Sequence, residues 1–486
     1  MKTIFRMSSP GRIGVSLPEL DVPVEASIPG GLTREGDGSI GLPEASEGQI
    51  LRHFVNLSTM NYHVDKGMYP LGSCTMKYNP KQFENLARIK GLSGIHPLCP
   101  DELAAGSLEL MHRLGQFLCE ITGFEGVSLQ PAAGAQGEFC GISLIKSYHE
   151  SRGEAHRNEV LMPDSAHGTN PASSTLADCV VVGVRSNEYG LVDPEDLKAK
   201  VGPNTAAFML TNPNTLGLFE SNIEALTSIV HEAGGLNYMD GANMNAMLGI
   251  AKPADIGFDV CHLNLHKTFA TPHGGGGPGS GPVTCTGELA RFLPDPVVTV
   301  DEDGNYILLK KQDSFGKLMA FHGNTGVLYK AYAYIRTLGA EGLREVSETA
   351  LINANYLKAK LGEYFDNPFD NGPCMHEFVL SGDRQVEHGV RTLDIAKRLL
   401  DYGFHAPTVY FPQIVHEAMM IEPTETESLE DLDAFAEAMI SIAGEAIEKP
   451  HLVTDAPVNT PVLRLDEVKA VKELCLVEPA EERDAP

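Results

Sequence analysis

Short apolar segments alternate with amphipathic segments along the middle of the chain. The apolar segments are each followed by turn-forming residues such as Pro, Gly, Asn and Asp, which is typical of buried strands. Because strands that alternate with helices form crossover units, the pattern predicts an α/β domain with a mostly parallel sheet covered by helices on both faces. The predicted strands are residues 160–162, 179–184, 206–210, 236–239 and 260–263.

The pattern changes after about residue 329, where long amphipathic segments dominate. Their spacing predicts helices at 329–338, 342–365, 390–402 and 429–447, with strands at 376–380 and 419–422, which together indicate a smaller α+β domain. The first 50 or so residues are rich in Pro, Gly and Ser and predict an extended arm, and the acidic end of the chain predicts disorder. The expected parts are an N-terminal arm and interface segment, a large domain, a small C-terminal domain and an acidic tail, at residues 1–90, 91–330, 331–475 and 476–486.

Composition excludes several classes of protein. The net charge is −28, from 37 Lys and Arg against 65 Asp and Glu, which argues against a nucleic-acid partner because phosphate is bound by basic side chains. The sequence has neither an apolar run long enough for a membrane span nor a secretory signal at its start. Its nine cysteines include no C-x-x-C pair, so neither a disulfide framework nor a zinc ribbon is expected. We therefore expect a cytoplasmic protein with reduced thiols.

Lys267 stands just after the last predicted strand, at the sheet edge where α/β proteins bind ligands. It precedes the four glycines of residues 274–277, which allow the backbone to approach a ligand closely. A lysine whose charge is suppressed can form a Schiff base with pyridoxal phosphate. A lysine beside glycines is more often a surface residue, so this feature needs support from others.

Three further features fit a pyridoxal phosphate site. Residues 134–137 lie just before a helical pattern that runs from 138 to 148, and the unpaired N–H groups of a helix start bind phosphate. His167 follows a predicted strand and can stack on a ring or transfer a proton. Asp240 follows another and can keep the ring nitrogen of the cofactor protonated. Each has an ordinary alternative as a turn, a helix junction or a structural histidine, so the prediction rests on their joint occurrence at successive strand ends.

Six segments of the sequence resemble the glycine decarboxylases, the P-proteins of the glycine cleavage system. The two most specific contain Gly-Ser-Cys-Thr-Met-Lys and Asn-Leu-His-Lys-Thr-Phe. The similar segments are residues 69–80, 130–138, 166–172, 211–215, 240–243 and 264–279.

The resemblance implies a fold type I pyridoxal-phosphate enzyme with a large domain and a smaller C-terminal domain. It implies that the substrate is glycine, which loses CO₂, and that the remaining aminomethyl group passes to the lipoyl arm of the H-protein. A chain of this length that holds the lysine resembles subunit 2 of the two-subunit form. We therefore expect a partner, subunit 1, in a heterotetramer with two chains of each kind.

The resemblance also implies roles for individual residues. Lys267 carries the cofactor covalently, Asp240 contacts its ring nitrogen and His167 stacks on the ring, and these three are the expected catalytic residues. The other expected cofactor contacts are Gly134, Ala135, Gln136, Thr211, Asn243 and His266.

Three alternative functions remain open at this point. Another fold type I enzyme acting on glycine or serine, such as an aldolase, would share the order of Asp240 and Lys267 but not the segment at residues 69–80. A non-catalytic supporting subunit would not need Lys267, Asp240 and His167 together. A nucleotide-binding enzyme is disfavoured because neither a P-loop lysine nor an acidic ribose contact accompanies the glycine run.

Overall fold

The computed structural model describes residues 2–23, 42–274, 277 and 279–476. Contacts divide the chain into two compact units. The larger unit comprises residues 64–459, and the smaller comprises residues 1–63 with 460–486. The candidate site residues all belong to the larger unit.

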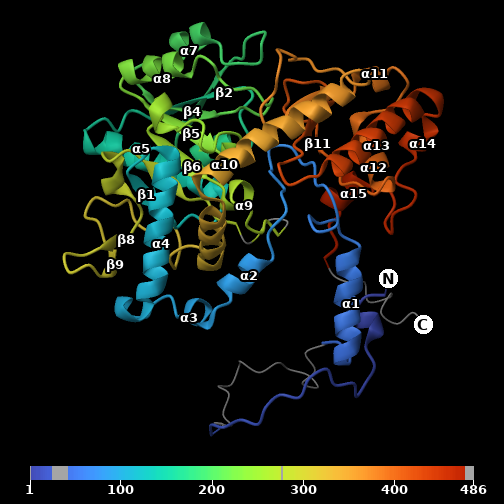
Figure 1. The fold of residues 1–486 in the computed structure, drawn as a ribbon, viewed down its shortest axis with the longest axis horizontal. Helices are drawn as coiled ribbons and strands as arrows, with labels where there is room; N and C mark the ends of the chain where they lie inside the picture. The colour runs from blue at the N-terminus through green and yellow to red at the C-terminus, as the bar shows by residue number, and fades with distance from the viewer. Residues whose placement is uncertain (1, 24–41, 275–276, 278, 477–486) are drawn as a thin grey trace. The chain divides into compact units, whose positions relative to one another are not determined.

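A seven-stranded sheet forms the centre of the larger unit, in the order β1-β7-β6-β5-β4-β2-β3 (Figure 1). Strand β7 runs antiparallel to both of its neighbours, whereas the pairs β6·β5, β5·β4, β4·β2 and β2·β3 are parallel. All five predicted strands are present, which confirms the predicted α/β class. The strands are β1 (Gly126–Ser128), β2 (Glu159–Pro163), β3 (Val180–Val184), β4 (Thr205–Thr211), β5 (Leu236–Gly241), β6 (Val260–Leu263) and β7 (Val283–Cys285).

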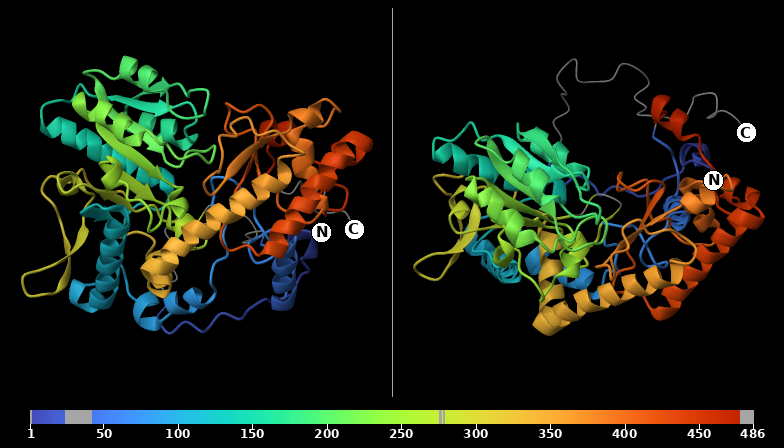
Figure 2. Two further views of the ribbon diagram at one scale, coloured as in Figure 1. Left: turned by 45° about the horizontal axis from the view of Figure 1, so that its top comes forward. Right: turned by 90° about the horizontal axis from the view of Figure 1, so that it is seen from above.

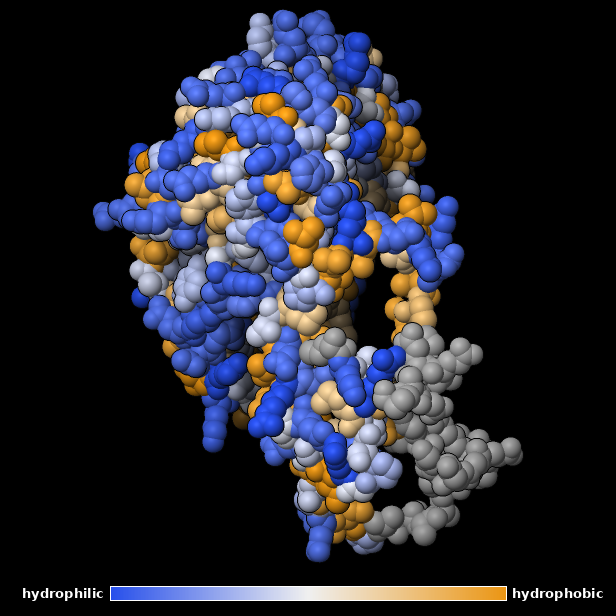
Figure 3. Space-filling model, turned by 90° about the vertical axis from the view of Figure 1, so that its right-hand side faces the viewer, coloured by the Kyte–Doolittle hydropathy of each residue, from blue (hydrophilic) through white to orange (hydrophobic). Residues whose placement is uncertain are grey.

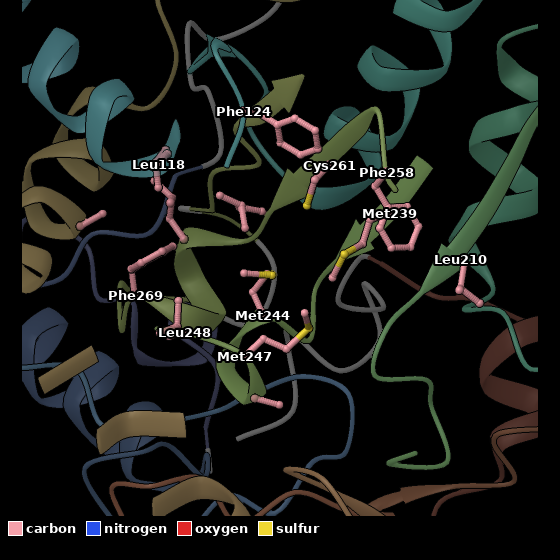
Figure 4. Close-up of a cluster of buried hydrophobic side chains, with 14 of the residues drawn as sticks. Leu118, Phe124, Leu210, Met239, Met244, Met247, Leu248, Phe258, Cys261 and Phe269 are labelled. Carbon is pink, nitrogen blue, oxygen red and sulfur yellow. The ribbon is translucent and has the colours of Figure 1, made fainter. Parts of the chain in front are cut away.

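Both faces of this sheet are covered by helices. Successive side chains of a strand point to opposite faces, and these strands are apolar on both faces, so each face needs a covering layer. In β4, Phe208 and Leu210 belong to one apolar cluster, while Ala207 and Met209 belong to another. Helix α5 packs on the second face, and α4, α8 and α10 pack on the first. Figure 4 shows part of the first cluster, where side chains of β5 and β6 meet those of the segments that follow them. The helices are α4 (Asp101–Thr122), α5 (Gly134–Ser151), α6 (Thr169–Leu176), α7 (Pro194–Lys200), α8 (Ile223–Glu232) and α10 (Thr325–Leu361).

Helix α10 leads from the large sheet towards a second, antiparallel sheet (Figures 1 and 2). It is interrupted at Gly339, whose φ of 66° and ψ of −173° are not helical, so the two helices predicted here are the two parts of α10. The second sheet has the order β10-β12-β11, and an apolar cluster joins it to α10 and α13. The elements are β10 (Phe378–Ser381), β11 (Thr408–Val409), β12 (Ala418–Ile421), α11 (Asp383–Val386), α12 (Thr392–Asp401), α13 (Leu429–Glu448) and α14 (His451–Thr454).

Several short elements have no counterpart among the predictions. They include β1, β7 and the hairpin of β8 (Val297–Val300) and β9 (Tyr306–Leu309). The larger unit also contains α2 (Gln82–Ala87), α3 (Lys90–Ser93), α9 (Leu265–Thr268), η2 (Met244–Ala246), η3 (Ala254–Ile256) and η4 (Leu289–Phe292).

The smaller unit contains η1 (Phe5–Met7), α1 (Glu47–Thr59) and α15 (Glu467–Lys472). Helix α1 is preceded by Ser46, whose side chain forms a capping box with Gln49. Helix α1 begins near the end of the predicted extended arm and continues beyond it to Thr59. The predicted disorder of the tail falls almost wholly on residues 477–486, which lie outside the described residues.

Polar and apolar side chains are mixed over the face drawn in Figure 3. In the described part of the chain, none of the helices combines the length and the apolar character needed to cross a bilayer.

Candidate active site

Lys267 and Asp240 lie at the carboxyl ends of adjacent strands, β6 and β5, where the parallel sheet presents its ligand-binding edge. Lys267 is in the short helix α9, which begins directly after β6. Both side chains are buried, at 8% and 2% exposure. The ammonium of Lys267 donates to the carbonyl oxygen of Ser73 at 2.6 Å. The structure therefore buries the predicted lysine and carboxylate at one edge instead of leaving either in a surface loop.

Asp240 is surrounded by donors. Its Oδ2 accepts from Asn170 Nδ2 at 2.9 Å and from the Thr211 hydroxyl at 3.4 Å, and its Oδ1 accepts from the Ala242 N–H at 2.9 Å. Nε2 of His262 lies 3.2 Å from Oδ1. Burial alone would raise the pKa of Asp240, but the neighbouring His262 and the Asn170 hydrogen bond outweigh it, so the pKa is lowered. Asp240 is thus held as a carboxylate, the form that can stabilise a protonated ring nitrogen.

His262 connects Asp240 to the interior of the sheet. Its Nδ1 lies 2.8 Å from the hydroxyl of Tyr238, which also donates to the carbonyl of Gly137 at 3.3 Å. Since both rings are fully buried, this chain of polar groups fixes the position of the Asp240 carboxylate.

His167 lies beside a second polar chain. Its Nδ1 is 2.8 Å from the hydroxyl of Thr169, which donates to the buried carboxylate of Glu138 at 2.6 Å. Burial lowers the pKa of His167, and the charge of Lys267 lowers it further, while Asp240 opposes the shift. His167 is therefore neutral at physiological pH, as a residue that stacks on a ring or transfers a proton requires.

The start of helix α5 is open to an anion. Ala133 precedes Gly134 without a side-chain cap, so the first N–H groups of the helix have no intrahelical acceptor. Gly134 is also required by packing, because a Cβ there would stand 2.6 Å from Oδ1 of Asn264. Both amide atoms of the Gln136 side chain already bond to main chain, to Ala132 N–H at 2.7 Å and Leu318 carbonyl at 3.1 Å. Gln136 can therefore meet a phosphate through its own N–H rather than its side chain.

His266 and Asn243, two further predicted cofactor contacts, both form hydrogen bonds within the protein. Nδ1 of His266 accepts from the Ser280 N–H at 3.3 Å, and burial with the charge of Lys267 lowers its pKa to about 3. Asn243 donates to the carbonyl of Pro213 at 2.9 Å and to Glu377 at 3.3 Å. Asn243 thus links the end of β5 to the segment that precedes β10.

The structure adds a segment that sequence reasoning recognised only as a family signature. Residues 71–77, here called the strap, lie over α9 and supply the carbonyl that Lys267 contacts. Two buried carboxylates, Glu377 and Glu422, bind the strap and were not predicted. The amino-acid sequence of the strap was recognisable because it resembles a family motif. No local sequence pattern identifies either glutamate as a residue that binds the strap.

Comparisons with known proteins show the family to which the chain belongs. Residues 12–309 match the family described as glycine cleavage system P-protein, and residues 346–460 match the family described as glycine dehydrogenase, C-terminal domain. A protein of Bacillus velezensis described as a probable glycine dehydrogenase (decarboxylating) subunit 2 is 57% identical over 472 residues, covering 96% of each chain. One of Chlorobium chlorochromatii with the same description is 57% identical and covers 97% of this chain and 98% of that protein.

Solved structures show the same fold. A crystal structure of glycine decarboxylase (P-protein) of the glycine cleavage system, in an inhibitor-bound form, has a TM-score of 0.71 at 23% identity, covering 84% of this chain and 92% of that chain. A cysteine desulfurase of Thermococcus onnurineus NA1 has a TM-score of 0.60 at 15% identity, covering 78% and 95%. The fold is that of fold type I pyridoxal-phosphate enzymes. With its curated relatives matched almost from end to end, the chain belongs to the glycine cleavage system P-protein family.

Proposed function

We propose that this chain is the catalytic, pyridoxal-phosphate-binding subunit that decarboxylates glycine and passes the aminomethyl group to the lipoyl arm of an H-protein. The observation that carries the proposal is that Lys267 and Asp240 are buried at one edge of the sheet of a P-protein family member, with the half-buried His167 close enough for both charges to shift its pKa. A supporting subunit without catalysis would have no reason to keep a lysine buried beside an ionised carboxylate.

The residues present fit pyridoxal phosphate. Lys267 would bind its aldehyde carbon, Asp240 its ring nitrogen, and the N–H groups of residues 134–136 its phosphate. Among the described residues, buried Oδ1 atoms of Asn170, Asn243 and Asn264 have no hydrogen-bond partner, which is expected of a site built for a polar ligand. Thr211 and His266 would stand near its ring and its phosphate. When bound, the cofactor draws electrons from the α-carbon of an amino acid into its conjugated ring.

The residues of this chain would act around that chemistry. The negative charge of Asp240 would stabilise the protonated ring nitrogen, which allows the ring to accept electrons. His167, neutral and half-buried, is able to lie against a ring face and to accept or return a proton. Lys267 supplies the amine that would hold the cofactor at rest. The amine of the substrate glycine can take its place, and Lys267 would bind the cofactor again after the reaction. Burial of Lys267 and Asp240 limits water, which favours loss of a charged carboxylate.

The proposal includes partners. The relatives are described as subunit 2, which implies a second subunit, and we propose a heterotetramer of two chains of each kind. Lipoylated H-protein is the proposed acceptor of the aminomethyl group, and a cytoplasmic location is proposed because the spacing of the cysteines fits reduced thiols rather than a disulfide framework. The sequence-based division into parts at residues 90, 330 and 475 is likewise proposed as the domain organisation.

The test is exchange of labelled bicarbonate into the carboxyl group of glycine by the two-subunit complex with lipoylated H-protein. Lys267→Ala should abolish the exchange and the borohydride-reducible cofactor bond. Lys252→Ala is the control, since the Lys252 side chain is partly exposed and pairs with the surface residue Glu120 at 2.8 Å. Exchange at the original rate in Lys267→Ala would contradict the proposal. Serine cleavage without H-protein would instead favour an aldolase.

A further inference from the structure

The strap is bound by carboxylates from a part of the chain about three hundred residues away. Ser73 donates both its N–H and its hydroxyl to Glu377, at 2.5 and 2.9 Å. Thr75 repeats the arrangement with Glu422, at 2.9 and 2.5 Å. Both glutamates are fully buried, at 0% exposure. Ser73 and Thr75, two residues apart in the strap, thus each donate two hydrogen bonds to a buried glutamate of their own.

These bonds hold an unusual backbone. Ser73 and Thr75 have φ of 53° and 42°, in the left-handed region that residues with a Cβ rarely adopt. Thr75 is β-branched, for which this conformation is especially unfavourable. Such conformations persist where the surroundings over-determine them. Here the two carboxylates supply that restraint.

The far end of the strap continues the pattern. Lys77 is buried and donates to Glu425 at 2.6 Å, to Asn245 at 2.7 Å and to the carbonyl of Thr268 at 3.0 Å. Thr268 is the residue after Lys267. The strap therefore contacts α9 twice, through the Ser73 carbonyl at the Lys267 ammonium and through Lys77 at the adjoining carbonyl.

The near end of the strap is anchored to the small sheet. Leu71 forms a bridge with Ile421 of β12, and the N–H of Gly72 donates to the carbonyl of Met420 at 3.3 Å. Gly72 has no room for a side chain, because a Cβ would stand 2.2 Å from Cγ of Met420. The strap is thus joined to β12 at one bridge and reaches from there to the lysine helix.

We propose that Glu377 and Glu422 are positioning residues for Lys267, which act by holding the strap so that the Ser73 carbonyl orients the Lys267 amine for capture of the cofactor aldehyde. The inference rests on the proposed function, since it assigns Lys267 as the cofactor anchor. The two glutamates do not contact the reacting atoms in this arrangement and act through the strap.

The charges around the pair agree with this role. Burial raises the pKa of Glu377 well above its usual value and that of Glu422 to about 7, while the charge of Lys267 opposes both shifts. The neighbouring His376 is fully buried, and burial lowers its pKa to about 3, so it adds no cation. Lys267 thus faces both members of the pair across the Ser73 carbonyl, and Lys77 adds a second positive charge near Glu422.

The experiment measures cofactor capture directly. Purified cofactor-free protein is mixed with pyridoxal phosphate, samples are reduced with borohydride at set times, and the modified Lys267 peptide is quantified by mass. In this step the amine adds to the aldehyde carbon with loss of one water, and borohydride reduces the resulting C=N bond to a secondary amine. Glu377→Gln and Glu422→Gln should slow capture about tenfold, as expected when an ordinary positioning hydrogen bond is lost.

Glu220→Gln is the matched control. Glu220 is equally buried, at 1% exposure, and also accepts a main-chain N–H, from Val192 at 2.9 Å, but it does not contact the strap. Its variant should lose stability and capture the cofactor at the original rate. Amide hydrogen exchange should rise at Ser73 and Thr75 only in the Glu377 and Glu422 variants.

A milder variant keeps the test informative if the glutamate variants do not fold. Ser73→Ala removes only the hydroxyl bond to Glu377 and should slow capture by a smaller factor with little change in stability. Capture at the original rate in Glu377→Gln, Glu422→Gln or Ser73→Ala protein that folds would overturn the inference while leaving the proposed function intact. If the unsubstituted chain itself forms no bond at Lys267, both fail.

Discussion

Gly141 should resist substitution by alanine because the ring of Tyr238 packs directly on it. Gly141 lies inside helix α5, and a Cβ at this position would stand 2.1 Å from Cε2 of Tyr238 and 3.0 Å from Cγ1 of Val260. The first distance is about 1.5 Å shorter than an ordinary carbon contact. Tyr238 is fully buried and its hydroxyl is bonded to His262, so the ring cannot move without disturbing that bond.

The magnitude follows from two opposing effects. Alanine in place of glycine inside a helix stabilises by about 1 kcal/mol. Overpacking a filled core costs about 1–3 kcal/mol, and loss of the bond between Tyr238 and His262 costs about 1 kcal/mol more. We therefore expect Gly141→Ala to lower the free energy of unfolding by about 1–3 kcal/mol.

Gly444→Ala is the matched control, because Gly444 lies inside helix α13 and a Cβ there would meet nothing within 4 Å. It should raise the free energy of unfolding by about 0.5–1 kcal/mol. Both variants would be compared with the original chain by urea unfolding followed by circular dichroism. An equal stabilisation by both substitutions would refute the reasoning, since it would mean that the Tyr238 ring can move away from the new methyl group without loss of stability.

Four other outcomes are expected. Asp240→Asn should bind pyridoxal phosphate but lose most glycine exchange activity, because a neutral amide cannot stabilise a protonated ring nitrogen; unchanged activity would exclude that role. Leu114→Ala, at a core position with 0% exposure, should destabilise by about 2–5 kcal/mol in urea unfolding, and a much smaller loss would mean that the core collapses around the gap. Asp193→Ala should cost about 1 kcal/mol in the same assay, because Asp193 accepts from the N–H groups at the start of α7; no loss would mean that water replaces the cap. For His266, whose pKa falls from 6.5 to about 3 on folding, only the unfolded chain takes up a proton below pH 6.5, so stability falls as pH falls from 6.5 towards 3. Between pH 7 and pH 5 the cofactor-free chain should therefore lose about 2 kcal/mol more than His266→Gln does, and parallel pH curves would contradict the shift.

The sequence determined the strands that carry the site and the residues at their ends. Period-two and period-3.6 patterns are local properties of the main chain, so the strand before Asp240 and the strand before Lys267 were predicted to within two residues. The parallel arrangement followed from the alternation of elements, and it brought those two side chains to one edge. The short strands β1 and β7 were missed because three residues beside glycines carry too little pattern.

Only the tertiary structure decided what surrounds the lysine. The strap was visible as a motif, but its backbone is held by Glu377 and Glu422, which lie hundreds of positions later in segments that look like ordinary strand ends. The same holds for His262, whose contact with Asp240 depends on the register of two neighbouring strands. Partners of this kind are selected by which surfaces pack together. A pattern of neighbouring residues encodes the local conformation of the chain but not the identity of a distant hydrogen-bond acceptor.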